Sequence, residues 1–218
     1  TYIKHRLNGF DGDSPRRTPK DLEEYPAFSK RASSSGGVPT YSRPQCVGPI
    51  SVKDLKPLEV DLQNFKDALS VSEATDAFMN AASPGVIAQF QPNQHYPDHS
   101  SYLYALADAM KVEYEGIAEA GLVIQIDSPD LALGRHVLFK DQSDEEFVAM
   151  AELHIEALNH ALQNIPAEQL RLHVCWGNYQ GPHHCDIEMK KILPAVLKAK
   201  PMALSFEGAN PRHSHEWS

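Results

Sequence analysis

The sequence has few of the features that mark secreted or membrane-bound proteins. It contains only three cysteines in 218 residues, Cys46, Cys175 and Cys185, an odd number that does not suit a disulfide framework. It has no run of about 18 apolar residues and no basic-then-apolar leader, so neither membrane insertion nor secretion is expected. We therefore expect a cytoplasmic chain whose thiols are reduced and free to act as ligands.

Positive charge is also scarce. The chain has 20 Lys and Arg residues against 29 Asp and Glu residues, which gives a net charge of −9. Nucleic acids and anionic membranes bind basic surfaces, so neither is expected as a partner. The phosphate-binding patterns G-x-G-x-x-G and G-x-x-x-x-G-K-S/T are missing, which removes support for a nucleotide-binding domain. The hydrophobic content of 42% still suffices for the core of one large domain.

Strand-like and helix-like segments alternate along most of the chain. We expect residues 1–45, which are polar and turn-rich, to form a long loop or insertion, and residues 46–218 to form a single domain. Ser143 and Glu146 form a capping box that opens one of the helices. The predicted strands are 46–50, 85–90, 122–126, 170–175 and 202–206, and the predicted helices are 57–82, 102–120, 143–162 and 187–198.

This alternation, with nearly continuous apolar strands, predicts a parallel sheet covered by helices, an α/β fold. Ionisable residues follow several strands: Asp127, then His173 and Cys175, then Glu207. In a TIM (β/α)8 barrel the carboxyl ends of the strands form one ring, which would bring these residues together. We therefore predict a TIM barrel. Only about five of its eight strands are visible, so we expect an incomplete fragment of the barrel.

An unclosed barrel would expose two sheet edges and apolar strand faces. We therefore expect the isolated chain to aggregate or to pair with another copy of itself as a homo-oligomer. Light scattering tests this expectation, and a monodisperse monomer would contradict it.

The pair His173 and Cys175 suggests a metal site. Residues two apart in a strand point to the same face, so this imidazole and this thiol can converge on one ion. Zinc accepts such ligands at roughly 2.0 Å for nitrogen and 2.3 Å for sulfur. His183, His184 and Cys185 follow closely and offer an alternative, a local zinc knuckle.

The other candidates also have ordinary structural interpretations. Asp127 suits a helix N-cap or a turn, and Glu207 suits an ion pair with Arg212 or a helix cap. Asn178, Asn210 and Arg212 are candidate contacts for an anionic substrate group at the mouth of the site.

We also predict the structural positions of four further residues. We expect Asp186 to cap the helix that follows it. We expect His213 and His215 to lie at the surface or in a substrate pocket, and Cys46 to be a small buried residue.

Several segments follow the order found in the catalytic domain of cobalamin-independent methionine synthases. The segments 173–179, 181–184 and 206–217 resemble more closely the short, single-domain members of that superfamily, which include methionine synthases and epoxyalkane:coenzyme M transferases. The resemblance spans most of residues 45–217. It rests on Gly48-Pro-Ile-Ser51, Tyr104-Ala-Leu-Ala-Asp-Ala-Met110 with Glu113 and Gly121, Gln125-Ile-Asp127-Ser-Pro129, His173-Val-Cys175 and Phe206-Glu207.

The resemblance implies a TIM barrel and an enzyme of methionine biosynthesis, a zinc-dependent thiol S-methyltransferase or alkyltransferase. It assigns His173, Cys175 and Glu207 as zinc ligands, together with a second family cysteine that has no match in this chain. It assigns Asp127 to the amino group of homocysteine. The methyl donor would be 5-methyltetrahydropteroylglutamate or a related folate.

Two departures from the family pattern leave the substrates open. Ser128 stands where the larger enzymes usually carry Glu, and the chain has no Trp in the folate region. One alternative is transfer from an epoxide or methyl ether to another thiol, such as coenzyme M. The other is a non-catalytic zinc-binding chain.

Overall fold

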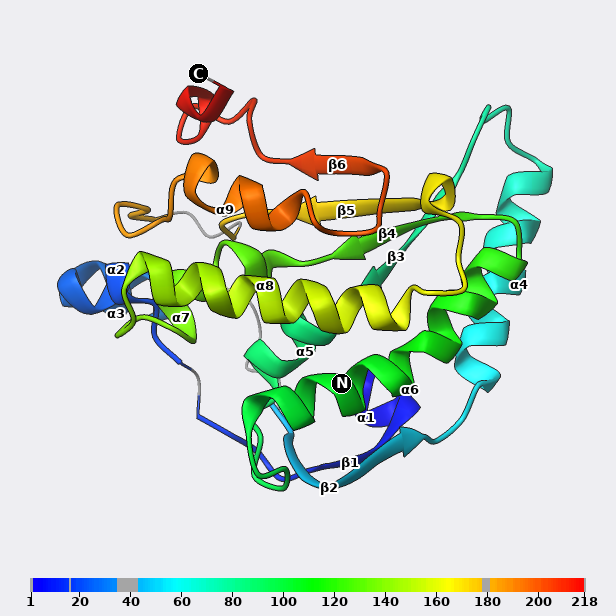
Figure 1. Cartoon of the computed structure of the whole chain (residues 1–218), viewed down its shortest axis with the longest axis horizontal. Coiled ribbons are helices and arrows are strands. Elements are labelled where there is room, and N and C mark those ends of the chain that lie inside the picture. The colour runs from blue at the N-terminus through cyan, green and yellow to red at the C-terminus, as the bar shows by residue number, and fades with distance from the viewer. Residues whose placement is uncertain (1, 16, 35–42, 178–180, 218) are drawn as a thin grey trace.

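The structure is a computed structural model that describes residues 2–15, 17–34, 43–177 and 181–217. Its elements alternate between helices and strands (Figure 1). In chain order they are α1 (Tyr2–Arg6), β1 (Leu7–Asp11), α2 (Lys20–Glu24), α3 (Pro26–Ser34), β2 (Gln45–Val52), α4 (Lys56–Ser70), β3 (Phe78–Ala82), α5 (Pro84–Phe90), α6 (His99–Glu119), β4 (Val123–Asp127), a 3-10 turn at Pro129–Leu131, α7 (Gly134–Val137), α8 (Asp144–Ala161), a 3-10 turn at Ala167–Gln169, β5 (Leu170–Val174), α9 (Met189–Val196), β6 (Ala203–Phe206) and a 3-10 turn at Ser214–Trp217.

A four-stranded parallel sheet forms the centre of the fold, with the strand order β3-β4-β5-β6 (Figure 1). Strands that follow one another in sequence are neighbours in the sheet, and at least one helix lies between each pair along the chain. This is how successive βα units are arranged in a TIM barrel. The predicted α/β fold with a parallel sheet is confirmed, and within the described ranges the sheet is not closed.

One face of the sheet is buried beneath the helices. Ile124, Ile126 and Leu172 belong to this face and are almost completely buried. They share one hydrophobic core with side chains of the two long helices, such as Leu106 of α6 and Ile155 of α8. Burying large aliphatic side chains contributes roughly 1.5–3 kcal/mol each, so this layer holds the helices against the strands.

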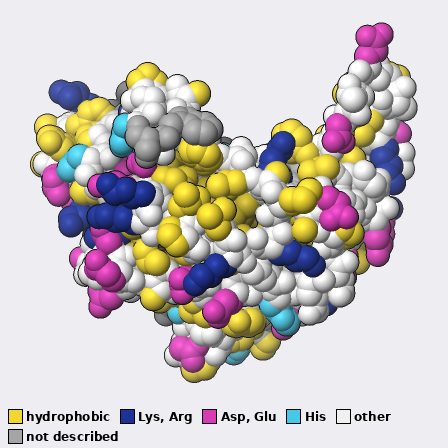
Figure 2. Space-filling view, turned by 45° about the horizontal axis from the view of Figure 1, so that its top comes forward, with side chains coloured by type: hydrophobic (Ala, Val, Ile, Leu, Met, Phe, Trp, Pro, Cys, Tyr) yellow, Lys and Arg dark blue, Asp and Glu magenta, His cyan; other side chains and the backbone are white. Residues whose placement is uncertain are grey.

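The opposite face of the strands is only partly covered. Because side chains alternate along a strand, Gln125 and Asp127 of β4 share this face with Arg171 and His173 of β5, their register partners. All four side chains have intermediate exposure. Figure 2 shows a broad hollow on one side of the molecule, where hydrophobic side chains gather.

Two elements between residues 70 and 90 were predicted as the wrong type. The helix predicted over 57–82 ends at Ser70, Phe78–Ala82 is β3, and the strand predicted over 85–90 is the helix α5. Ser83 starts α5 by accepting a hydrogen bond from the Val86 N–H at 2.9 Å. Residues 84–89 are all buried, so α5 lacks the polar face that marks a helix in a sequence.

The prediction of a long loop over residues 1–45 is also wrong in its secondary structure. This segment contains α1, β1, α2 and α3, and β1 pairs antiparallel with β2. The strand predicted at 46–50 therefore lies in this two-stranded sheet and not in the parallel one. Elements this short leave little periodicity in a sequence, because contacts with distant residues stabilise them. The division into two regions at residue 45 remains a prediction.

Elsewhere, local signals in the sequence were sufficient to predict the secondary structure. The capping box is confirmed, because the Ser143 hydroxyl accepts from the Glu146 N–H at 3.2 Å and the Glu146 carboxylate accepts from the Ser143 N–H at 2.8 Å. The predicted strands at 122–126, 170–175 and 202–206 correspond to β4, β5 and β6. In the described parts of the chain, no helix combines the length and the apolar character needed to cross a membrane.

Candidate metal and substrate site

Four predicted site residues lie at the carboxyl ends of three adjacent parallel strands. Asp127 ends β4, His173 lies in β5, Cys175 follows β5 and Glu207 follows β6. The strand register pairs Asp127 with His173, and it pairs the residues that directly precede Cys175 and Glu207. All four residues therefore lie at one edge of the sheet.

His173 and Asp127 face each other across this edge. The Nε2 atom of His173 lies 4.0 Å from Oδ1 of Asp127. Burial raises the pKa of Asp127, and the nearby His173 offsets part of this effect. The other ring nitrogen of His173, Nδ1, is buried and has no hydrogen-bond partner among the described residues. Such an unpaired buried atom is uncommon, and it leaves a nitrogen available to a ligand.

The thiol of Cys175 lies in surroundings that disfavour its ionised form. Burial raises its pKa to about 11; the backbone of Gly177 opposes this effect, and the carboxylates of Asp127 and Glu207 add to it. A cation placed among these groups would have the opposite effect, because it favours the thiolate, which is the form of cysteine that binds metals.

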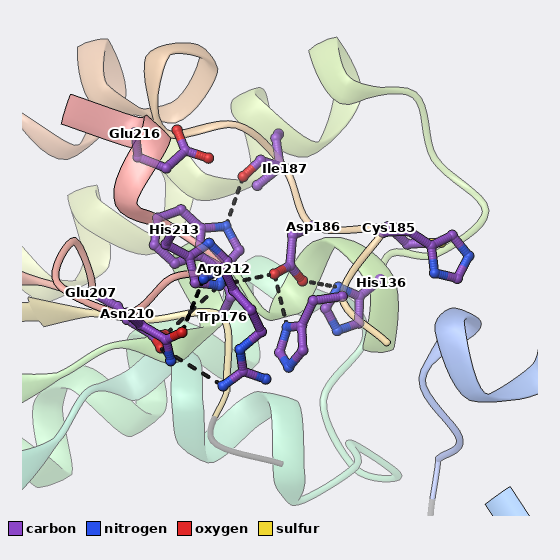
Figure 3. Close-up of polar contacts among 12 residues, drawn as sticks. His136, Trp176, Cys185, Asp186, Ile187, Glu207, Asn210, Arg212, His213 and Glu216 are labelled. Atoms are coloured by element: carbon purple, nitrogen blue, oxygen red, sulfur yellow. Dashed lines mark hydrogen bonds and ion pairs between the residues drawn. The ribbon is translucent and has the colours of Figure 1, made fainter. Parts of the chain in front are cut away.

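Glu207 contacts residues of its own segment. Its Oε1 accepts a hydrogen bond from the Asn210 side chain at 2.6 Å and lies 3.9 Å from Nη2 of Arg212 (Figure 3). Its Oε2 lies 3.9 Å from Nε2 of His213. The ordinary interpretation of Glu207 as an ion-pair partner of Arg212 therefore has structural support. Asn210 and Arg212, predicted as substrate contacts, both lie beside this carboxylate.

The three predicted ligands do not share one coordination sphere in the structure. Among the described residues, three groups of His, Cys, Asp and Glu side chains have potential ligand atoms that all lie within 4.8 Å of one another. None of these groups contains His173, Cys175 or Glu207. The three groups are Asp21 with His184 and Cys185, His183 with Asp186 and His213, and Asp21 with His136 and Asp186.

Asp186 lies at the centre of the polar cluster in Figure 3. Its Oδ2 is 2.9 Å from His183 Nδ1 and 3.3 Å from His213 Nε2, and its Oδ1 is 3.1 Å from His136 Nδ1. Burial alone would raise the pKa of Asp186, but its contacts with His136 and His183 outweigh burial and lower it. The expectation that Asp186 caps the next helix is wrong, because α9 begins only at Met189.

His213 is buried, contrary to the expectation of a surface or pocket position. Its ring stacks on that of Trp176, with centroids 4.2 Å apart and planes 11° apart. The Trp176 ring N–H donates to the backbone oxygen of Ile187 at 2.7 Å. His215 is exposed, as expected. The polar segment around His213 gave no periodic signal of burial, because its packing partners lie elsewhere in the chain.

Of two further predicted residues, one lies within the described parts of the chain. Asn178, a predicted substrate contact, lies outside the described residues. Cys46 is completely buried, which confirms its expected role as a small apolar residue.

A buried row of polar side chains was missed entirely. The Ser83 hydroxyl donates to Oδ1 of Asp130 at 2.8 Å, Oδ2 of Asp130 lies 2.8 Å from His154 Nδ1, and His154 Nε2 lies 2.8 Å from His99 Nε2. The available signal was His154, an ionisable residue on the buried side of α8. A buried histidine needs a polar partner, and here the partner is Asp130.

Comparisons with known sequences give consistent results. No family model matches the chain. A methionine synthase from Saccharolobus solfataricus is 30% identical over 173 residues, which cover 77% of this chain and 47% of the relative. One from Saccharolobus islandicus is 30% identical over 145 residues, covering 64% and 40%. One from Sulfurisphaera tokodaii is 29% identical over 144 residues, covering 66% and 37%.

A solved structure shares the fold. It is a B12-independent methionine synthase from Shewanella sp. W3-18-1 in complex with selenomethionine, and it superposes with a TM-score of 0.62 at 16% identity over 94% of this chain and 53% of that one. The chain belongs to a cobalamin-independent methionine synthase-like family. It spans about half the length of the curated methionine synthases that it matches. The roles of Asp127, His173, Cys175 and Glu207 in this methionine synthase-like chain remain predictions.

Proposed function

We propose that the chain is part of a zinc-dependent thiol S-methyltransferase that forms methionine from homocysteine and a 5-methyltetrahydrofolate-type donor. The observation that carries this proposal is that Asp127, His173, Cys175 and Glu207 all lie at the carboxyl ends of three adjacent strands, β4, β5 and β6. The methionine synthase relatives support it. The proposal places the protein in the cytoplasm, where its thiols stay reduced.

His173, Cys175 and Glu207 are the residues that would hold the zinc. They offer nitrogen, sulfur and oxygen, which are the donor types that zinc accepts in proteins. The buried, unpaired Nδ1 of His173 supports a ligand at this position. When bound, zinc supplies a positive charge that keeps a substrate thiol in its reactive thiolate form at neutral pH.

Asp127 would bind the amino group of homocysteine. Its side chain is about half exposed (48%) on the partly open face of the sheet, so a small molecule can reach it. Its ion-pair partner, His173, lies 4.0 Å away, which leaves the carboxylate able to accept a closer hydrogen bond. An ammonium group there would form the charge-assisted pair that orients the substrate thiol.

A second candidate is alkyl transfer from an epoxide or methyl ether to another thiol, such as coenzyme M. Ser128, which stands where the larger family enzymes usually carry Glu, favours this alternative. It is buried, and its hydroxyl has no hydrogen-bond partner among the described residues. A neutral hydroxyl in place of a carboxylate removes a negative charge next to Asp127. This difference in charge changes which acceptor thiol suits the site. A third candidate is a non-catalytic zinc-binding role.

Methionine formation from homocysteine and 5-methyltetrahydropteroyltriglutamate tests the first candidate. We expect Asp127→Asn to raise KM for homocysteine by about tenfold to a hundredfold, because it removes one charge-assisted hydrogen bond. Asp108→Asn is the matched control, since Asp108 is exposed and pairs with His160 on the helical side. Activity with coenzyme M or epoxides alone would contradict this candidate and support the second one.

A further inference from the structure

A pocket lies beside the start of α6. Its volume is about 230 Å³, and its walls include Arg17, Ala88, His99, Tyr102 and Leu138. Pockets for drug-sized ligands usually measure about 300–1,000 Å³, so this one suits a smaller molecule. None of the predicted zinc ligands lines it.

The buried row of polar side chains connects this pocket to the strand ends. Ser83 directly follows β3, and Asp130 lies three residues beyond the end of β4. Ser83, Asp130 and His154 are almost completely buried, and the row ends at His99 in the pocket wall. Gly85 makes the row possible, because a Cβ atom there would lie 2.0 Å from Oδ2 of Asp130 and 2.5 Å from Nδ1 of His154.

With His154 neutral, the row determines which nitrogen of His99 carries the hydrogen. The Asp130 carboxylate can only accept, so Nδ1 of His154 donates to it. In neutral His154, Nε2 then carries a lone pair and accepts from the Nε2–H of His99. The remaining nitrogen of His99, Nδ1, is left as an acceptor, and it has no hydrogen bond within the described ranges. Burial and the neighbouring His154 lower the pKa of His99 to about 4, so the ring is neutral at pH 7.

Arg17 adds a positive charge to the same pocket. Its Nη1 is buried without a hydrogen-bond partner, and Arg17 takes part in no ion pair among the described residues. The carboxylate of Asp98 also lines this pocket, and it accepts a hydrogen bond from the Ser101 N–H at 2.7 Å. A buried guanidinium N–H without an acceptor is costly, and an oxyanion is the partner that fits its geometry.

We propose that this pocket binds a small molecule that carries an oxyanion and a hydroxyl or similar donor. The guanidinium of Arg17 holds the carboxylate or phosphate, and Nδ1 of His99 accepts from the donor. Asp130 and His154 are positioning residues, since they set the tautomer of His99 without touching the ligand. The inference does not depend on the proposed methyl transfer.

Nitrogen-15 NMR of the histidine rings, recorded on the full chain, tests the proposal directly. Glycolate, acetate and inorganic phosphate are the probes. We expect an unprotonated Nδ1 on His99 in the free protein and a saturable shift of that nitrogen with glycolate or phosphate. Acetate, which has no hydroxyl donor, should bind more weakly than glycolate. The tighter of glycolate and phosphate identifies the oxyanion as carboxylate or phosphate.

Variants distinguish binding in a specific pocket from non-specific ion binding. We expect Arg17→Gln to weaken binding at least about tenfold, the usual consequence of losing a charge-assisted hydrogen bond. Lys66→Gln removes the same charge from an exposed position on α4 and should leave the affinity unchanged. His99→Leu should make glycolate and acetate bind equally.

Three results would overturn the proposal. They are a protonated Nδ1 on His99 in the free protein, no saturable shift with any probe, or equal affinities of the wild type and Arg17→Gln. If Arg17→Gln does not fold, Arg17→Lys takes its place. It keeps the charge but loses the planar fork of donors, so we expect weaker binding than in the wild type, and an unchanged affinity would contradict the role of Arg17.

Discussion

Alanine at His173 or at Cys175 should remove zinc from the purified chain. We expect about one zinc per wild-type chain at the predicted site. Zinc sites in folded peptides contribute roughly 10–16 kcal/mol over four ligands, so losing one ligand should cost roughly 3 kcal/mol, or about a hundredfold in affinity. Metal analysis after dialysis against a chelator that buffers free zinc measures this difference.

The other two cysteines provide matched controls. Cys46→Ala removes a thiol that is buried in the core, and Cys185→Ser removes one that lies near Asp21 and His184. Both variants should keep the zinc of the wild type. If Cys185→Ser loses zinc while Cys175→Ala retains it, the metal belongs to the group of Asp21, His184 and Cys185. Unchanged zinc in both His173→Ala and Cys175→Ala would rule out the predicted site.

Replacing Arg6 by methionine should destabilise the protein by about 3–5 kcal/mol, the usual cost of leaving one partner of a buried ion pair alone. Nη1 of Arg6 lies 2.9 Å from Oε2 of Glu113 on α6, and both side chains are buried. Arg6 also pairs with Asp61 on α4, and the Tyr2 hydroxyl donates to Glu113. Without Arg6, the described residues leave the buried Glu113 carboxylate with no cation in contact with it. Urea unfolding at equilibrium measures the loss.

An exposed ion pair nearby gives the control for this prediction. Lys4 pairs with Asp11 at 2.6 Å, and both side chains are exposed. We expect Lys4→Met to change the free energy of unfolding by less than about 1 kcal/mol, because exposed pairs contribute little. The double variant Arg6→Met with Glu113→Gln should recover part of the loss, since it removes the unpaired charge. An Arg6→Met variant as stable as Lys4→Met would contradict the buried pair.

The amino-acid sequence by itself predicted the elements whose signals are local. Alternation along β5 places His173 opposite the buried Leu172, and the capping box of Ser143 and Glu146 marks the start of α8. The order of apolar strands and helices sufficed for a parallel sheet, because crossover connections of this kind bring successive strands side by side. The same order placed Asp127, His173 and Glu207 at one edge of that sheet.

Only the tertiary structure decided what is buried by distant parts of the chain. Phe78–Ala82 is a strand and Pro84–Phe90 is a helix because of where they pack, and α5 shows no polar face in the sequence. The clusters around Asp186 and Asp130 join residues that lie far apart along the chain. The hydrophobic periodicity of a sequence reflects the environment of residues within one helix or strand. The contacts between a buried carboxylate and its histidine partners depend instead on how several elements pack together. For this reason the positions of His173 and Cys175 were predictable, and the polar networks around Asp186 and Asp130 were not.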